Sequence, residues 1–232
     1  MIPKIVHYCW FGKNPYSKTT NECLKTWKKY LYDYEFILWN EDNSPMNHPF
    51  VVKAYKEKKY AFVADYVRLW AIYNYGGIYL DTDMYIIKEF DNIILDNITL
   101  FGFETLKKDV ISAGIICATP KNDFIYSILN KYDFITFDVY NIKNIKIPKI
   151  ITDTYTTFEN KESITLLAYD FFYPFPLKNR SEKSFLDYKT ENTYAIHLWE
   201  KSWFTWNDYI LSKMINTINR IRHCFDNHQF LN

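Results

Sequence analysis

Short apolar runs and helical spacing alternate along the first part of the chain. Residues 4–8 and 35–39 are short apolar runs of the kind that forms buried strands. Residues 19–30 and 50–58 repeat their apolar positions at the spacing of an amphipathic helix. The pattern predicts strand, helix, strand and helix in this order. The residues available as N-cap of the first helix are Thr19, Thr20 and Asn21.

The strongest helical pattern covers residues 61–75, which are apolar on almost every side. Gly76 and Gly77 follow, and a glycine can end a helix because it adopts a left-handed conformation without steric cost. The next apolar run, residues 78–80, predicts a short buried strand. Two aspartates come directly after it, so the segment predicts a buried strand that ends in carboxylates.

Later apolar runs are shorter and mostly typical of strands. Helical spacing returns at residues 124–132 and 211–225, whereas residues 134–148 have weak periodicity and predict a loop or a small insertion. Strands that alternate with helices early and become frequent later predict an α/β fold with a mixed, mostly parallel sheet flanked by helices. The later strands are expected at residues 84–87, 99–103, 111–118, 164–169 and 194–198.

Composition and charge exclude several classes of protein. The chain has 232 residues and a net charge of +1, so nothing indicates a nucleic-acid partner. Its four cysteines are scattered and form no CxxC pair, which fits a reducing compartment. The N-terminal run reads as a strand rather than a signal peptide, and no run reaches the length of a membrane span. We therefore expect a cytoplasmic protein.

Asp81 and Asp83 flank Thr82 directly after the predicted strand. In an extended segment, residues two apart point the same way, so both carboxylates can reach one cation. Ligands of open α/β sheets bind beyond the carboxyl ends of the strands. Two carboxylate oxygens favour Mg²⁺ or Mn²⁺ and leave positions for water and substrate phosphate. The pattern predicts a metal site, and the alternative is a solvated turn.

Asp65 and Arg68 lie three residues apart on the predicted apolar helix, so they share one face. An exposed ion pair of this kind contributes only about 0.5 kcal/mol. Charges in a helix that is apolar nearly all round are either paired in the core or serve a site. We favour a site in which Arg68 contacts phosphate or a sugar hydroxyl and Asp65 accepts hydrogen bonds from sugar hydroxyls.

Aromatic residues make up 20% of the chain. This share fits either a biased base composition of the coding sequence or a role of aromatic rings in stacking on sugar rings. Trp10 follows the first strand and is either core or a platform for a nucleobase. Residues 194–203 combine further candidates: His197 for a metal, and Ser202 and Trp203 for phosphate oxygens. The alternative for this segment is a core histidine beside core tryptophans.

Only five glycines occur, and their positions exclude a G-x-G-x-x-G turn and a P-loop. A bound diphosphate would therefore have to be neutralised by a metal and by side chains. No Ser-His-Asp or Cys-His order indicates a hydrolase.

Four ordered blocks carry a resemblance: IPKIVHYCWFG, ADYVRLWAIYNYGGIYLDTDM, FFYPFP and HLWEKSW. Together they resemble the bacterial capsular and polysaccharide glycosyltransferases with the DXD sugar-binding region. These are relatives of the yeast initiating mannosyltransferases and, more distantly, of the clostridial glucosylating toxins. The resemblance implies a GT-A fold, a nucleotide-sugar donor, a divalent metal (usually Mn²⁺) and retention of anomeric configuration. One departure is that residues 111–114 read ISAG where relatives often carry Asn-Ala.

The resemblance also implies roles for the residues that would bind the donor. Trp10 would stack on the base, and Tyr79 would line the donor pocket. Asp65 and Arg68 would bind the donor sugar. Asp81 would contact both the ribose and the sugar.

The same resemblance implies a metal and diphosphate site. Asp83, together with Asp81, would bind the metal. Relatives complete the metal shell with either a histidine or an acidic residue near the last block, so His197 and Glu200 both qualify, and we prefer His197. The residues that would contact the diphosphate are Ser202 and Trp203.

The implied function is transfer of a hexosyl unit from a UDP-sugar to a saccharide acceptor in capsule, exopolysaccharide or other surface-glycan synthesis. The metal and Arg68 would stabilise the departing diphosphate, and a phosphate oxygen would take the acceptor's proton. Replacing Asp65 or Arg68 by alanine should cut turnover strongly and leave the fold intact. We expect one domain, residues 1–232. Residues 1–118 would bind the nucleotide sugar, and residues 119–232 would form the acceptor side and the C-terminal closing segment.

Two other functions fit parts of the pattern. A phosphatase with an aspartyl nucleophile also uses a strand followed by D-x-D, but Tyr85 stands where Thr or Val is usual, and a downstream acidic pair is missing. An aromatic-rich sugar-binding module without catalysis would not need to bind a nucleotide.

The predicted helix 211–225 carries a separate hypothesis. It bears Lys213, Arg220, Arg222 and His223, so it could rest on an anionic membrane as a peripheral contact, near a lipid-linked acceptor. The alternative is that it docks onto the domain core.

Overall fold

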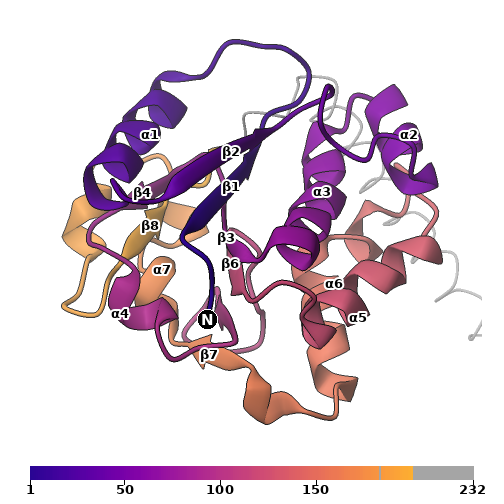
Figure 1. Ribbon diagram of the computed structural model, residues 1–232. Helices are drawn as coiled ribbons and strands as arrows, with labels where there is room; N and C mark the ends of the chain where they lie inside the picture. The colour runs from indigo at the N-terminus through magenta and orange to yellow at the C-terminus, as the bar shows by residue number, and fades with distance from the viewer. Residues whose placement is uncertain (183, 201–232) are drawn as a thin grey trace, which may run out of the picture. The chain divides into compact units, whose positions relative to one another are not determined.

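A six-stranded mixed sheet forms the centre of residues 1–182 and 184–200, which are the residues that the computed structural model describes (Figure 1). The strand order is β2-β1-β3-β6-β5-β7, with parallel pairing of β1 to β2, β1 to β3 and β5 to β7. Strand β6 is antiparallel to both its neighbours, so the prediction of a mixed, mostly parallel sheet is confirmed. The strands are β1 (Ile5–Cys9), β2 (Glu35–Trp39), β3 (Gly77–Leu80), β5 (Thr99–Gly102), β6 (Ile115–Ala118) and β7 (Thr165–Leu167).

A second, two-stranded sheet pairs β4 (Met84–Ile86) with β8 (Ala195–His197) in antiparallel register. Met84 lies opposite His197 in this pairing. Both strands were predicted, but the sequence does not show that they pair with each other. The pairing matters because it brings residue 197 beside the aspartates that follow β3.

Helices cover both faces of the large sheet, with α2, α3, α5 and α6 on one side and α1, α4 and α7 on the other (Figure 1). They are α1 (Lys18–Tyr30), α2 (Pro49–Lys56), α3 (Tyr60–Tyr75), α4 (Asp91–Ile94), α5 (Asp123–Leu129), α6 (Ile147–Thr157) and α7 (Tyr169–Phe172). Short 3-10 turns lie at Asn130–Asp133, Ile142–Asn144, Lys161–Ser163, Leu177–Asn179 and Phe185–Tyr188.

Alternation along the central strands divides the core into two hydrophobic clusters. Tyr79 of β3 packs in the cluster under α3, whereas its neighbours Ile78 and Leu80 pack in the cluster under α1. This is the period of two that a strand imposes when both of its faces are covered. Residues Met1–Glu200 form one compact unit. No helix in the described part of the chain is long and apolar enough to cross a membrane.

Several predicted boundaries were wrong. Helix α1 begins after Ser17, whose hydroxyl accepts the Thr20 N–H at 2.9 Å, so none of the three expected N-cap residues caps it. Helix α6 begins inside the stretch predicted as a loop and was missed. The strand expected at residues 111–118 forms only over β6, with one isolated bridge from Ile111 to Phe103. The predicted helix 211–225 lies outside the described residues.

Gly76 and Gly77 let the chain pass from α3 directly into β3. Their φ angles are 67° and 98°, and the predicted need for positive φ after the helix is confirmed. The ψ of Gly76 is −165°, so the residue adopts a conformation open essentially only to glycine and not the left-handed helical cap that the sequence suggested. A Cβ at Gly77 would lie 2.5 Å from the Ile5 carbonyl oxygen, because β3 pairs closely with β1 here.

Replacing Gly77 by alanine should lower the free energy of unfolding by at least ~2 kcal/mol, because the change adds both a strained φ and a backbone clash. Urea denaturation followed by circular dichroism measures this loss. Val52→Ala, at a side chain that is 51% exposed on α2, is the control and should change the same free energy by less than ~0.5 kcal/mol. Equal stability of the two variants would contradict the prediction.

Candidate metal and donor site

The segment after β3 is a tight turn. The Met84 N–H donates to the Asp81 carbonyl at 3.0 Å, and the Asp81 N–H donates to the Gly114 carbonyl at 2.8 Å. The expectation that the aspartates lie on an extended segment was therefore wrong. Their carboxylates still converge, because the turn folds Asp83 back toward the strand end that Asp81 occupies.

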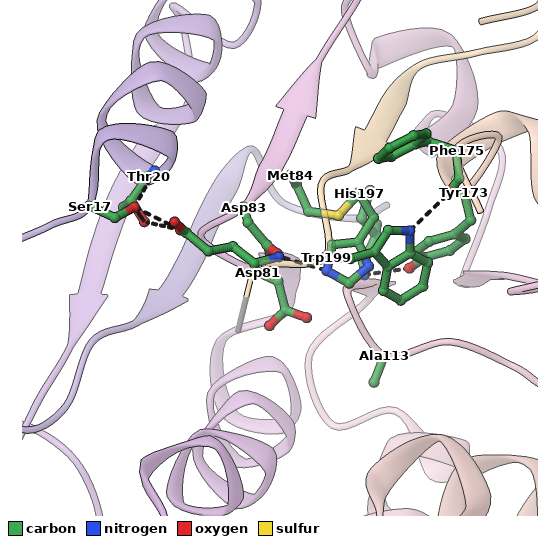
Figure 2. Close-up of polar contacts among 12 residues, drawn as sticks. Ser17, Thr20, Asp81, Asp83, Met84, Ala113, Tyr173, Phe175, His197 and Trp199 are labelled. Carbon is green, nitrogen blue, oxygen red and sulfur yellow. Dashed lines mark hydrogen bonds and ion pairs between the residues drawn. The ribbon is translucent and has the colours of Figure 1, made fainter. Parts of the chain in front are cut away.

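Asp81, Asp83 and His197 form the candidate metal cluster of the described residues. Each offers one ligand atom, and these atoms all lie within 4.8 Å of one another. The Asp83 Oδ1 and His197 Nε2 atoms are 3.1 Å apart. Figure 2 shows the two side chains beside each other. The register of the small sheet places His197 beside the aspartates, because His197 pairs with Met84, the first residue of β4.

Glu200, the alternative third ligand, is turned away from this cluster. Its Oε2 accepts a hydrogen bond from the Ser17 hydroxyl at 2.7 Å, at the N-terminus of α1 (Figure 2). A carboxylate is favoured there by the helix dipole. Its backbone N–H instead donates to the Asp83 Oδ2 at 2.6 Å. The geometry favours His197 as the ligand and Glu200 as a residue that orients Asp83 through its backbone.

In this cluster, burial disfavours the charged forms of Asp83 and His197, and their mutual contact favours them. Asp83 and His197 are only 6% and 9% exposed. Burial opposes the charge of Asp83, but His197 and the Glu200 N–H outweigh it and hold the pKa of Asp83 below its usual range. Burial likewise opposes protonation of His197, yet Asp83 raises the pKa of His197. The His197 ring packs against Trp199 with 4.0 Å between centroids.

The donor set fits a divalent cation. Two carboxylate oxygens and one imidazole nitrogen are acceptable to Mn²⁺, and the remaining positions would suit phosphate oxygens and water. Asp83 already has a second partner, the Glu200 N–H, that fixes its orientation. The His197 Nδ1 is buried and has no hydrogen-bond partner within the described residues, whereas the Nε2 faces the Asp83 carboxylate, which can only accept, so the Nε2 carries a proton in this arrangement.

Arg68 links the helix to the aspartate turn. Its guanidinium is 5% exposed and pairs with Asp65 at 3.0 Å and with Asp81 at 3.1 Å. It also donates to the Ala113 carbonyl at 2.8 Å and lies 4.4 Å from the centroid of the Tyr79 ring. The sequence suggested that Arg68 contacts substrate, whereas the structure gives most of its donors to the protein. It holds Asp81 in place.

Arg68, Asp81, Tyr79 and Asp65 together form a group of linked side chains that we call the clamp. The Tyr79 hydroxyl donates to Asp81 Oδ1 at 3.1 Å, so two side chains hold the same oxygen. Asp65 is 7% exposed, and the Ile147 N–H at the start of α6 favours the charged form of its carboxylate. Burial raises the pKa of Asp65, while Arg68 acts in the opposite direction. A helix that the sequence did not predict therefore contributes to the site.

Trp10 lies beyond the carboxyl end of β1, at the same sheet edge as Asp81. Its ring is partly buried; the indole N–H donates to the Asn14 carbonyl at 2.6 Å, and the ring meets Tyr16 edge-on. A role in base stacking stays a prediction. Ser202 and Trp203, the predicted diphosphate contacts, lie outside the described residues.

Sequence reasoning missed three residues of this region, Glu104, Lys146 and Tyr173. Glu104 comes two residues after β5, and Asp81 directly follows β3. A search for polar residues just beyond the ends of the strands could therefore have found Glu104. Tyr173 hydrogen bonds the Ile115 N–H at 2.9 Å and lies 5.9 Å from the His197 ring. Lys146 precedes a helix that was read as a loop, so no pattern indicated it.

Residues 17–99 match the family described as the glycosyltransferase sugar-binding region containing the DXD motif. The matched region contains the clamp residues Asp65, Arg68, Tyr79 and Asp81, together with Asp83. The chain is 30% identical over 155 residues to Glucan organizing enzyme 1 of Cryptococcus neoformans var. grubii, covering 62% of this chain and 41% of that protein. It is 28% identical over 139 residues to Inositol phosphoceramide mannosyltransferase 1 of Schizosaccharomyces pombe, covering 56% and 42%.

The chain thus spans less than half of the length of these two relatives. Among solved structures, the PaToxG glycosyltransferase superposes with a TM-score of 0.52 at 18% identity, covering 66% of this chain and 69% of that one. This likeness establishes the fold, which is of the GT-A type predicted from the sequence.

Replacing Asp83 by asparagine or His197 by alanine should weaken Mn²⁺ binding by ~10-fold or more, because the first change removes the negative charge of one candidate ligand and the second removes another candidate ligand. Calorimetric titration of Mn²⁺ into the protein measures the affinity. Glu200→Gln is the matched control and should retain the affinity, since its backbone N–H to Asp83 is kept. If Glu200→Gln loses as much affinity as His197→Ala, then Glu200 is a ligand.

Replacing Arg68 by alanine should lower the free energy of unfolding by about 3–5 kcal/mol, because the buried Asp65 and the partly buried Asp81 lose their shared cation. This changes the expectation, drawn from the sequence, that such a variant keeps its fold intact. Urea denaturation of Arg68→Ala beside Arg180→Ala, at an exposed arginine, measures the difference. A stable Arg68→Ala variant would show that the clamp does not hold the fold.

Proposed function

We propose that this protein is a metal-dependent retaining glycosyltransferase, which moves a hexosyl unit from a UDP-sugar to a hydroxyl of a saccharide acceptor. The observation that carries the proposal is the convergence of Asp81, Asp83 and His197 at the carboxyl edge of a GT-A sheet. The match of residues 17–99 to the DXD sugar-binding region supports it. The name of the S. pombe relative, a mannosyltransferase, agrees with hexosyl transfer.

The three ligands would hold Mn²⁺ or Mg²⁺, which supplies positive charge to the diphosphate as the glycosidic bond breaks. The protein's contribution is to fix those ligands before substrate arrives. Arg68 and Tyr79 both bind Asp81, and the Glu200 N–H binds Asp83. Electrostatic stabilisation is strongest when the charged groups need no reorganisation during the reaction.

The donor sugar would lie between the metal and Asp65. Asp65 shares Arg68 with Asp81, and the two acids bind different terminal nitrogens of its guanidinium. A hexose beside Asp81 could thus be reached by Asp65, whose free lone pairs suit sugar hydroxyls. In this arrangement Arg68 acts mainly through Asp65 and Asp81. Trp10 stacking on the base, and Ser202 and Trp203 on the diphosphate, complete the proposal.

The acceptor would be a saccharide of a surface glycan, such as capsule or exopolysaccharide. A lipid-linked acceptor is supported by the name of the S. pombe relative, which acts on inositol phosphoceramide. Membrane contact through the predicted helix 211–225 stays a prediction, because that segment lies outside the described residues.

Titration of UDP into the protein should give binding that requires Mn²⁺ and disappears with EDTA or in Asp83→Ala, because the metal joins the diphosphate to the carboxylates. Calorimetry measures the affinity. Asp96→Ala, at an exposed aspartate, is the control and should bind as the wild type does. Absence of binding with UDP and GDP would contradict a nucleotide-sugar donor and leave a sugar-binding module as the better reading.

A further inference from the structure

Glu104 lies at the same sheet edge as the metal cluster. Strands β3 and β5 are each antiparallel to β6, so they run in the same direction and their carboxyl ends share one edge. Asp81 directly follows the first of these strands, and Glu104 comes two residues after the second. Ligands bind at this edge in α/β sheets. Glu104 is thus placed by the sheet, although it is 23 residues beyond Asp81 in the chain.

The hairpin that carries Glu104 is fastened to the site. The Glu104 N–H donates to the Val110 carbonyl at 2.9 Å, which fixes the register of the two arms. On the returning arm, the Ala113 carbonyl accepts from Arg68 at 2.8 Å, and the Gly114 carbonyl accepts the Asp81 N–H at 2.8 Å. The backbone around Glu104 and the aspartate turn therefore form one rigid connection.

Residues of the site act electrostatically on Glu104. His197 and Lys146 attract its carboxylate, and Tyr173 also interacts with it, whereas Asp109, an exposed acid farther along the hairpin, repels it. Lys146 acts on Asp65 as well. Glu104 is therefore electrostatically linked to the groups at this sheet edge.

The Glu104 carboxylate nevertheless has no fixed partner. It is partly buried, and within residues 1–182 and 184–200 it has no side-chain hydrogen bond or ion pair. It is not a member of the metal cluster, which consists of Asp81, Asp83 and His197. A partly desolvated carboxylate that neither binds the metal nor pairs with a cation is available to a substrate.

We propose that Glu104 is the general base of this site, the group that takes the proton from the attacking hydroxyl. The proposal rests on the proposed function. The nucleophile's oxygen forms a bond to the anomeric carbon while the bond from that carbon to the diphosphate oxygen breaks and its electron pair leaves with the diphosphate. The proton of the nucleophile passes to Glu104 and then to water. This role replaces the phosphate oxygen that the sequence analysis expected to take the proton.

Two further observations fit this role. Burial raises the pKa of Glu104, and a base whose pKa lies closer to the working pH accepts a proton more effectively. Glu104 also shares a sheet edge with the metal cluster and acts electrostatically on His197, and the diphosphate is proposed to bind at this edge. In a retaining transfer without a covalent intermediate, the nucleophile arrives from that same side.

The test uses hydrolysis of the donor, in which water replaces the acceptor and no acceptor needs to be known. Wild type, Glu104→Gln and Asp109→Asn are incubated with Mn²⁺ and with UDP-glucose, UDP-galactose, UDP-N-acetylglucosamine or GDP-mannose. Glu104→Gln keeps the size of the side chain and removes its basicity. Asp109 is an exposed acid on the same hairpin, hydrogen bonded only to Thr105 among the described residues, and serves as the matched control.

We expect kcat for hydrolysis to fall ~100-fold or more in Glu104→Gln, which is the usual contribution of a general base. KM for the donor and Kd for UDP with Mn²⁺ should stay within about twofold of wild type, because binding is intact. Asp109→Asn should keep kcat, KM and Kd within about twofold of wild type at neutral pH and should retain the decline in acid, because it removes only a repelling charge and leaves Glu104 in place. At saturating donor and Mn²⁺, wild-type kcat should fall as acid protonates Glu104, and this decline should be absent in Glu104→Gln.

Three outcomes would overturn the role. Equal kcat in wild type and Glu104→Gln would show that Glu104 does not take the proton, with the proposed function unaffected. Loss of UDP binding in Glu104→Gln would assign the residue to the donor site or to the fold instead. Failure of the wild type to hydrolyse any of the four donors would contradict the proposed function itself, and the role of Glu104 with it.

Discussion

The buried guanidinium of Arg68 is the contact on which the rest of the site depends. It joins Asp65 on α3, Asp81 after β3 and the Ala113 carbonyl before β6, which are three separate elements. A buried and a partly buried carboxylate this close would repel each other without a shared cation. Arg68 therefore lets one sheet edge hold both acids and also fixes the hairpin that carries Glu104.

Strand direction explains how residues far apart in the chain meet at this edge. The parallel pairing of β1 with β3, and the two antiparallel steps through β6, bring the ends of β1, β3 and β5 to one side. The small sheet then adds a residue from the end of the described chain, since β8 places His197 114 residues from Asp83 and 3.1 Å away. The sheet supplies positions, and the turns and hairpins supply the polar side chains.

Much of the fold and part of the site could be predicted because their signals are local. The apolar helix before Gly76, the short strand after it and the carboxylates of Asp81 and Asp83 follow from periodicity and from glycine's freedom. Local patterns could not show that β4 pairs with β8, because strand pairing is a long-range property. Helix α6 was missed because its four buried positions stand among polar residues and follow an Asn-rich stretch without a capping side chain.

The balance of charge at the edge favours a bound divalent cation. Asp65, Asp81, Asp83 and Glu104 bring four carboxylates, and the cations that act on some of them include Arg68 and Lys146. A diphosphate approaching this edge alone would meet an excess of negative charge in a partly desolvated space, where repulsion is strong. A divalent cation at the metal cluster offsets that excess. We therefore expect the metal to bind before or together with the nucleotide, since the carboxylates that hold the cation would otherwise repel the substrate.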